Sequence, residues 1–355
     1  MANRYRVGAT GDWADGVNGW SLTSGGAAGQ ADPTAADDVF FDGNSGTGTV
    51  TVAASAACRS FNGTGYGGTI AGTSQISFGD ATIGNITLGS GMTWSQSGNF
   101  RLSSSTGVNT ITTNGVSIAG RILFQFAVDT GSWRMDDALT TTNGSPIQFN
   151  TNSTFNTNGF TLTANGVTTA NSPTITLGAS SIVLNGTGTL WDIASGATLN
   201  SNTSAISITD TSSTGKTVAL GGKTYNNMSV TAGGTGLVNF SGATNNTFNT
   251  LTLAGPKSVR FAASQTQTFT SFVADGTAGN LVTIDSSLAG TAATLSDAGG
   301  TNAVTYVSLQ DSTATGGASW TAEFSTNVSG NTGWTFLVVA GGSTTTSTAM
   351  LVGVG

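Results

Sequence analysis

Short runs in which apolar and polar residues alternate recur along the chain, and Gly or Asn bounds most of them. Examples are Thr49–Val52, Thr174–Leu177 and Ile206–Ile208. Such alternation is the pattern of a strand with one buried face. Good helix formers are scarce, whereas Ser, Thr, Asn and Gly, which compete with the helical backbone or weaken it, are abundant. The pattern therefore predicts an all-β protein.

One strand motif repeats at a stride near 22 residues in the C-terminal half: Tyr225–Val230 recurs as Phe248–Leu253 and again as Phe269–Ala274. A second strand-like run lies between the copies, with an apparent stride from Val238 to Val259 to Val282. A sandwich or barrel has no reason to repeat a motif at this stride, but each coil of a solenoid does.

The sequence thus predicts a single-stranded parallel β-helix (a β-solenoid) of about twelve coils, capped at both ends. Its coils stack at strand spacing, so Met228, Leu251 and Phe272 should form one interior stack. Coil corners need positive φ angles, which Gly and Asn tolerate. Five Asn-Gly pairs are predicted corners: Asn114-Gly115, Asn143-Gly144, Asn158-Gly159, Asn165-Gly166 and Asn185-Gly186.

Composition divides the chain into four predicted segments. Residues 1–45 form an N-terminal cap or attachment module, which holds Trp13, Trp20, Asp37 and Asp38. Residues 46–303 form the solenoid, and residues 304–339, where the coil period is lost, form a C-terminal cap. Residues 340–355 are a low-complexity tail, expected to be ordered only if a partner holds it.

Charge and residue content exclude several kinds of chemistry. Only 8% of residues are charged, against about 25% in an average soluble domain, and the net charge is −7. With no histidine and a single cysteine, Cys58, the chain cannot build a Ser-His-Asp or Cys-His nucleophile, a His-based metal site or an internal disulfide. We expect no metal and no cofactor. The absence of a Lys/Arg cluster argues against a nucleic-acid partner.

Apolar runs are short, and none approaches the roughly 20 residues that a membrane-spanning helix needs, so we expect no membrane insertion. The first eight residues include no apolar stretch, so we also expect no ordinary secretory signal.

Two sets of residues are candidates for function. Asp129 with Asp136 or Asp137, beside Trp133, could supply the two carboxylates of a glycoside hydrolase, although a solvated loop is the favoured interpretation. Trp94, Trp133 and Trp191 could stack on sugar rings, although packing in coil interiors or between subunits is favoured. The N-terminal aspartates are interpreted as turn caps rather than as a Ca²⁺ site.

Both ends of the chain carry motifs that resemble a module of bacteriophage structural proteins. The motifs are Asn3–Trp13, Gly19–Ser21, Ser24–Gly26 and Pro33–Asp42 at the beginning, and Asp311–Trp320 with Gly330–Phe336 at the end. The chain departs from the module at Arg6, where Trp is usual, and at Ala9, where Gly is usual. The matching segments cover about a fifth of the chain.

The resemblance implies a non-enzymatic virion protein, a fibre or decoration appendage on tail or capsid, assembled in the cytoplasm of the bacterial host. By analogy it would be a homotrimer that contacts other virion proteins and weakly attaches to host surface glycans. Two alternatives remain open: a tailspike-like polysaccharide depolymerase and a bacterial surface adhesin.

Overall fold

The structure, a computed structural model, describes residues 2–79, 84–103, 106–125, 131–231, 234–340 and 343–346. It is all-β, with one short 3-10 helix, η1 (Gly16–Asn18), in these ranges. The strands form parallel sheets that build a β-solenoid of about 13 turns with a period of about 22 residues, which confirms the predicted fold class. The chain divides into two compact units, Met1–Gly186 with Gly196–Ser204, and Thr187–Ser195 with Ala205–Gly355.

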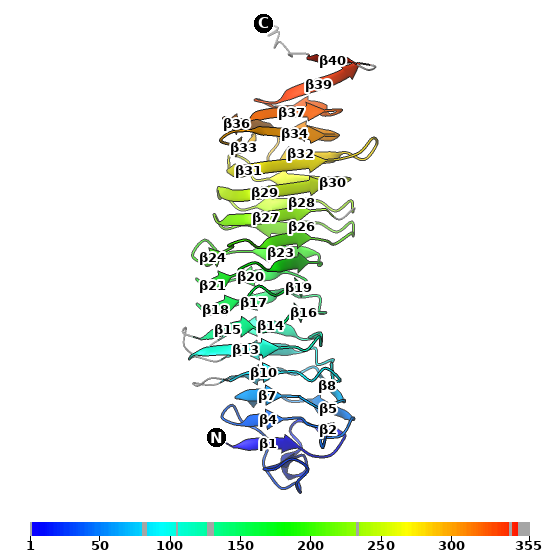
Figure 1. Ribbon diagram of the computed structural model, residues 1–355, viewed down its shortest axis with the longest axis vertical. Coiled ribbons are helices and arrows are strands. Elements are labelled where there is room, and N and C mark those ends of the chain that lie inside the picture. The colour runs from blue at the N-terminus through cyan, green and yellow to red at the C-terminus, as the bar shows by residue number, and fades with distance from the viewer. Residues whose placement is uncertain are drawn as a thin grey trace. The chain divides into compact units, whose positions relative to one another are not determined.

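In unit 1 the chain passes repeatedly through the same walls, and successive passes add parallel strands to them, although the walls differ in length. Sheet A holds β3 (Trp20–Ser21), β1 (Asn3–Arg6), β4 (Asp38–Phe40), β7 (Ser60–Asn62), β10 (Ile86–Thr87), β13 (Val108–Thr112), β15 (Ser132–Met135), β18 (Thr154–Asn156), β21 (Thr174–Thr176) and β24 (Thr198–Asn200), in that spatial order. Figure 1 shows β1, β4, β7, β10 and β13 one above the next.

The other walls of unit 1 are built in the same way. Sheet B holds β2 (Gly11–Asp12), β5 (Thr49–Val52), β8 (Thr69–Gly72) and β11 (Thr93–Trp94). Sheet C holds β6 (Ala56–Cys58), β9 (Ile76–Phe78), β12 (Asn99–Leu102), β14 (Arg121–Phe124), β17 (Ile147–Phe149) and β20 (Val167–Thr169). Sheet D holds β16 (Leu139–Thr140), β19 (Leu162–Ala164) and β22 (Ser181–Leu184).

Unit 2 has two long walls. One holds β23 (Gly188–Asp192), β26 (Lys216–Ala219), β28 (Val238–Ser241), β30 (Lys257–Phe261), β32 (Val282–Ser286), β35 (Val307–Gln310) and β38 (Thr326–Ser329). The other holds β25 (Ala205–Ile208), β27 (Thr224–Val230), β29 (Asn246–Ala254), β31 (Thr266–Asp275), β34 (Thr301–Thr305), β37 (Ser319–Glu323), β39 (Thr335–Ala340) and β40 (Ser343–Thr346), and β33 (Ala293–Asp297) and β36 (Ser312–Gly316) extend it from β31.

The interior consists of ladders of equivalent side chains, because parallel strands in register place identical positions one above another. The predicted stack is confirmed: Met228 pairs with Leu251, and Leu251 pairs with Phe272. All three are at most 2% exposed. Tyr225, Phe248 and Phe269 form a second, aromatic ladder, whose ring centroids are 5.6 and 5.5 Å apart.

Two details of the predicted coils were wrong. Val259 pairs with Ile284, whereas Val282 pairs with Lys257, so the apparent stride to Val282 is two residues out of register. Among the Asn-Gly pairs, those at Asn114 and Asn158 have the positive φ angles expected of corners. The Asn of each other pair, Asn143, Asn165 and Asn185, does not.

Parallel pairing extends into both segments predicted to be caps. Strand β1 pairs in parallel with β4, so the first residues already belong to the stack of sheet A. Between residues 304 and 339 the parallel pairing continues, from β35 to β38 and from β37 to β39. The parallel ladder therefore runs on past residue 303. In the segment 340–355, residues 341–342 and 347–355 lie outside the described residues.

Candidate functional site

Aromatic rings close the interior of the first coils of unit 1. Trp13 and Trp20 are 1% and 0% exposed, with ring centroids 5.3 Å apart in an edge-to-face arrangement. The indole of Trp20 donates a hydrogen bond to the carbonyl of Trp13 at 2.9 Å. Phe41 packs against both rings, at 5.8 Å. The structure thus brings together the two tryptophans predicted for the N-terminal module.

A buried guanidinium accompanies these rings. Arg6, only 1% exposed, lies with its Cζ 5.6 Å from the Trp20 ring centroid. Its Nη1 donates to the carbonyl of Asp12 at 2.8 Å, and its Nη2 lies 3.3 Å from a carboxylate oxygen of Asp15. Burial lowers the pKa of Arg6, and the charge of Asp15 opposes this shift. Arg6 therefore acts in this core through stacking and an ion pair.

Asp37 ties the N-terminal backbone to the start of β4. Its carboxylate accepts hydrogen bonds from the N–H of Ala2 at 3.0 Å, the N–H of Thr34 at 3.1 Å and the hydroxyl of Thr34 at 2.9 Å. Burial alone would raise the pKa of Asp37, but these hydrogen bonds and the attraction of Arg4 outweigh it, so the pKa lies below its ordinary value. Asp37 is thus an ionised structural group.

Asp38 is the first residue of β4 and points outward, because the next residue, Val39, is buried and successive residues of a strand face opposite sides of the sheet. It lies on the outer face of sheet A, where it forms an ion pair with Arg59 and accepts a hydrogen bond from the hydroxyl of Ser60. Phe40, two residues on, lies on the same face and stacks on Tyr5, with ring centroids 4.7 Å apart and ring planes 16° from parallel.

These outward groups line an open depression of about 400 Å³ on β4, β7 and β10. We call it the sheet A depression; its outward lining includes Asp38, Phe40, Arg59, Asn62, Asn85 and Thr87. Phe40 pairs with Asn62, and Asn62 pairs with Thr87, so a ring, an amide and a hydroxyl follow one another on neighbouring strands. An aromatic ring beside a few polar groups is typical of a small-ligand site.

Two other depressions on unit 1 are lined by described residues. One, of about 430 Å³, adjoins the last strand of sheet B and includes Met92, Thr93 and Val116. The other, of about 380 Å³, is formed by Thr140–Gly144 with Asn165 and Asn185. Neither is lined by a charged side chain. The sheet A depression combines charge, amide groups and an aromatic ring.

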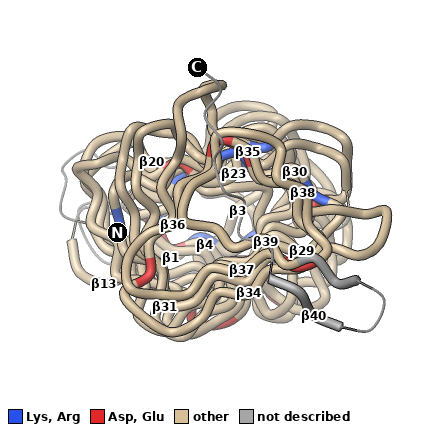
Figure 2. The backbone as a smooth tube through the Cα atoms, turned by 90° about the horizontal axis from the view of Figure 1, so that it is seen from above, with Lys and Arg blue, Asp and Glu red and all other residues tan. Residues whose placement is uncertain are grey.

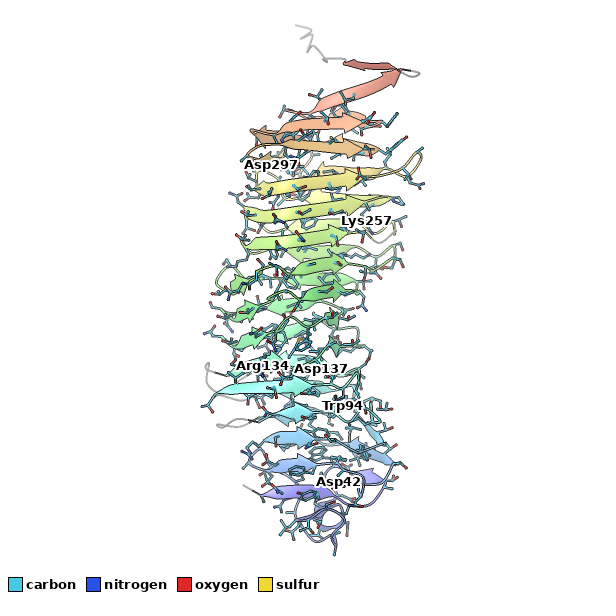
Figure 3. All side chains as sticks on the ribbon, viewed as in Figure 1. Asp42, Trp94, Arg134, Asp137, Lys257 and Asp297 are labelled. Atoms are coloured by element: carbon cyan, nitrogen blue, oxygen red, sulfur yellow. The ribbon has the colours of Figure 1, made fainter. Side chains whose placement is uncertain are left out.

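The predicted carboxylate pair is only partly described, since Asp129 lies outside the described residues. Asp136 lies 2.9 Å from Arg134 Nε, with which it forms an ion pair. Asp137 instead accepts backbone hydrogen bonds, from Thr113 at 2.8 Å and from Asn114. It therefore supports a corner of the preceding coil, and Figure 3 shows it at the same level of unit 1 as Arg134. Neither aspartate lines the three depressions.

The three tryptophans proposed as sugar platforms lie in coil interiors. Trp94, Trp133 and Trp191 are 2%, 0% and 1% exposed. The Trp191 indole donates to the hydroxyl of Tyr225 at 3.0 Å, and that hydroxyl donates to the carbonyl of Leu220 at 2.8 Å. Buried to this extent, none of the three rings offers an open face to a ligand. Trp94, labelled in Figure 3, contributes to the lining of the depression that adjoins the last strand of sheet B.

Sequence reasoning missed Phe40, Arg59, Asn62, Asn85 and Thr87. Phe40 lies beside Phe41 in an apolar run and the other four lie in short mixed runs, so only the coil register shows that they share one face. The phage-like motif Pro33–Asp42 includes Phe40 and was a partial signal.

Charged groups are sparse elsewhere, as Figure 2 shows along the tube. In unit 2, the buried Lys216 lies 2.6 Å from Asp210, and Lys257 donates to the carbonyl of Gly234 at 3.0 Å. Burial and the charge of Lys216 lower the pKa of Lys257. These lysines hold backbone loops.

Within the described ranges, no group of three or more His, Cys, Asp or Glu side chains is placed to hold a metal ion. No helix in this part of the chain is long and apolar enough to cross a membrane. The chain matches no family model, no curated protein and no solved structure.

Proposed function

We propose that the chain is a non-enzymatic structural appendage of a bacteriophage virion, on tail or capsid, that attaches weakly to surface glycans. The observation that carries the proposal is the outer surface of the solenoid, where neutral polar side chains form ladders. Thr154, Thr174 and Thr198 are aligned on neighbouring strands of sheet A. The parallel row of Asn156, Thr176 and Asn200 lies beside them.

Such ladders suit multivalent recognition of a polymer. Hydroxyl and amide groups offer both donors and acceptors, and the stacking of coils repeats them at strand spacing. The same arrangement recurs in unit 2, where the hydroxyls of Ser207 and Ser229 are 3.1 Å apart and the amides of Asn227 and Asn249 are joined at 3.1 Å. Many weak contacts acting together give useful avidity without one deep pocket.

The phage-like motifs support the virion assignment by their place in the fold. Residues of the opening motif supply Trp13 and Trp20, and they also supply Asp37, which anchors β4. We propose assembly in the host cytoplasm, contacts with other virion proteins, and a homotrimer, for which the weakly charged faces leave little electrostatic repulsion. Sedimentation of the purified chain measures the oligomeric state.

A cryo-EM reconstruction of purified virions that contain the chain tests the assignment. We expect its density on the tail or on the capsid. Location of the chain on the bacterial surface, without virions, would overturn the assignment in favour of an adhesin.

Digestion of host capsule by the chain, lost on Asp129→Asn and Asp136→Asn substitution, would overturn the non-enzymatic part in favour of a depolymerase. The single substitution Asp137→Asn is the control, since that carboxylate is engaged by backbone N–H groups.

A further inference from the structure

The sheet A depression differs from the polar ladders around it in chemical composition. Beyond it, the outer residues of β13 are Thr110 and Thr112, next to the depression, and Val108 farther along the strand. The depression itself is lined by Phe40, a half-buried ring on the outer face that stacks on the neighbouring ring of Tyr5. What sets Phe40 apart is its surroundings, since its ring lies beside a charged pair and amide groups in one depression.

The charged pair of the depression still has hydrogen-bonding capacity. Arg59 and Asp38 are 17% and 16% exposed at their side chains, so both are within reach of a ligand. A guanidinium carries five N–H donors, and the Asp38 carboxylate has about four acceptor positions. Because one positive and one negative group neutralise each other, the depression has no net charge to attract an ion.

We infer that the sheet A depression binds a segment of a neutral hexose polysaccharide. A pyranose ring has an apolar face, which would lie on the ring of Phe40, and a rim of hydroxyls, which would meet Arg59, Asp38 and the amides of Asn62 and Asn85. The inference rests on the proposed glycan attachment and assigns it to one place. An acidic polysaccharide fits less well, because the chain as a whole carries a charge of −7.

The geometry also favours a linear ligand. The lining residues lie in three consecutive strands of one wall, β4, β7 and β10, or directly before the last two, and the polar ladder continues on β13. A chain of sugars lying across the strands would therefore leave the ring of Phe40 and meet Asn62, Thr87 and Thr112 in succession, since these residues are aligned in register.

The test is calorimetric titration of the full-length chain with linear hexasaccharides of glucose, mannose and galactose. Oligogalacturonate is the acidic comparison. We expect at least one neutral hexasaccharide to bind, and to bind more tightly than oligogalacturonate. The substitution Phe40→Leu keeps apolar volume but removes the ring, and should weaken binding about fivefold or more. Arg59→Lys keeps the charge beside Asp38 but loses the planar fork, and should weaken it similarly.

The matched control is Phe324→Leu. Phe324 is 48% exposed and stacks on Tyr306 at 4.9 Å, but it lies in unit 2, outside the depression. Its substitution should change affinity less than about twofold. Unchanged thermal unfolding of each variant excludes misfolding as the cause.

Absence of binding to all three neutral hexasaccharides would overturn the inference, as would equal losses for Phe40→Leu and Phe324→Leu. A change of oligomeric state in Phe40→Leu without a change in sugar affinity would overturn it in favour of contact with a second copy of the chain.

The two proposals fail separately. If the chain is found on virions but does not bind these sugars, the proposed sugar site is overturned and the virion assignment stands. If the chain binds these sugars through Phe40 but is absent from virions, the sugar site stands and the virion assignment is overturned.

Discussion

Arg6 is the most unusual residue of the core, since a guanidinium that is 1% exposed needs partners for its charge. It has three: the carbonyl of Asp12, the carboxylate of Asp15 and the ring of Trp20. Desolvation makes such a pair a weak source of stability, yet removing one partner leaves an uncompensated charge. The cost of substitution therefore depends on which partner is removed.

We expect Asp15→Asn to destabilise unit 1 by about 1–2 kcal/mol, less than for a fully buried pair, because Asp15 is 31% exposed and water screens the charge. In the double variant Arg6→Met with Asp15→Asn, an apolar side chain replaces the unpaired cation. This variant should be more stable than Asp15→Asn alone. Guanidinium denaturation of both variants checks the order, and equal or reversed midpoints would contradict it.

Gly316, at the end of β36, is a second residue whose role follows from geometry. Its φ angle is +93°, and a Cβ built on it would lie 1.8 Å from the carbonyl oxygen of Asp297 in the neighbouring strand. Only a residue without a side chain fits there.

Gly316→Ala should therefore destabilise unit 2 by about 2 kcal/mol or more. The control is Gly144→Ala, where a Cβ meets nothing within 4 Å and the φ angle is not in the left-handed region. That substitution should be neutral or stabilising by about 0.5 kcal/mol, through the unfolded state. Thermal unfolding midpoints of the two variants measure the difference, and a Gly316→Ala variant as stable as Gly144→Ala would be the contrary result.

At the scale of elements, the link between the N-terminal backbone and β4 depends on ionised Asp37. Its folded pKa is below the unfolded value, because hydrogen bonds to the carboxylate outweigh burial. The stabilisation is present above the unfolded pKa, at about pH 4 and higher, and is lost as the pH falls through the folded pKa.

The melting temperature of the wild-type chain should thus fall as the pH decreases from about 5 to about 2, and part of this fall should be absent in Asp37→Asn. Asp275→Asn, at an exposed carboxylate, is the control and should leave the pH dependence close to that of the wild type. Calorimetry across this pH range compares the three proteins. Identical slopes for the wild type and Asp37→Asn would mean that other carboxylates carry the acid sensitivity.

The elements were the part of the structure most open to prediction. Alternation identified the strands, and the repeat from Tyr225 to Phe248 to Phe269 set their register, because identical positions in parallel coils lie above one another. The predicted register was wrong at Val282, because a longer loop before this strand shifts its pairing by two residues without changing its alternation. A shift by two residues keeps the same face buried, so the hydrophobic pattern cannot reveal it.

The candidate site was less predictable for a related reason. Asp38, Arg59 and Asn85 are separated by more than twenty residues from one to the next, and only the coil length brings them to one face. The tryptophans are candidates for sugar stacking because they are large aromatic residues, but the same size suits them to fill wide coil interiors. The outward ring, Phe40, is followed directly by the buried Phe41. The sequence alone does not show which of these two rings lies on the outer face of the sheet.

For the whole molecule, a solenoid differs from a globular domain in how its parts support one another. Each coil contacts mainly its neighbours, so stability is approximately a sum of coil and interface contributions, and local opening need not spread. The chain carries a built-in reporter of such opening in unit 1. Cys58 on β6 is fully buried, and burial raises the pKa of its thiol well above its ordinary value, so it should react with thiol reagents only when its coil opens.

This reporter tests whether disturbance stays local. Phe78 pairs with Cys58 across neighbouring strands, so Phe78→Ala should accelerate alkylation of Cys58 by about tenfold or more. Leu251→Ala removes a comparable interior side chain from the ladder of unit 2, and should leave the alkylation rate within about twofold of the wild type. Rates measured with iodoacetamide under native conditions decide the matter. Equal acceleration by both variants would show that the two units open as one cooperative structure, and a coil's stability would then depend on coils far along the chain.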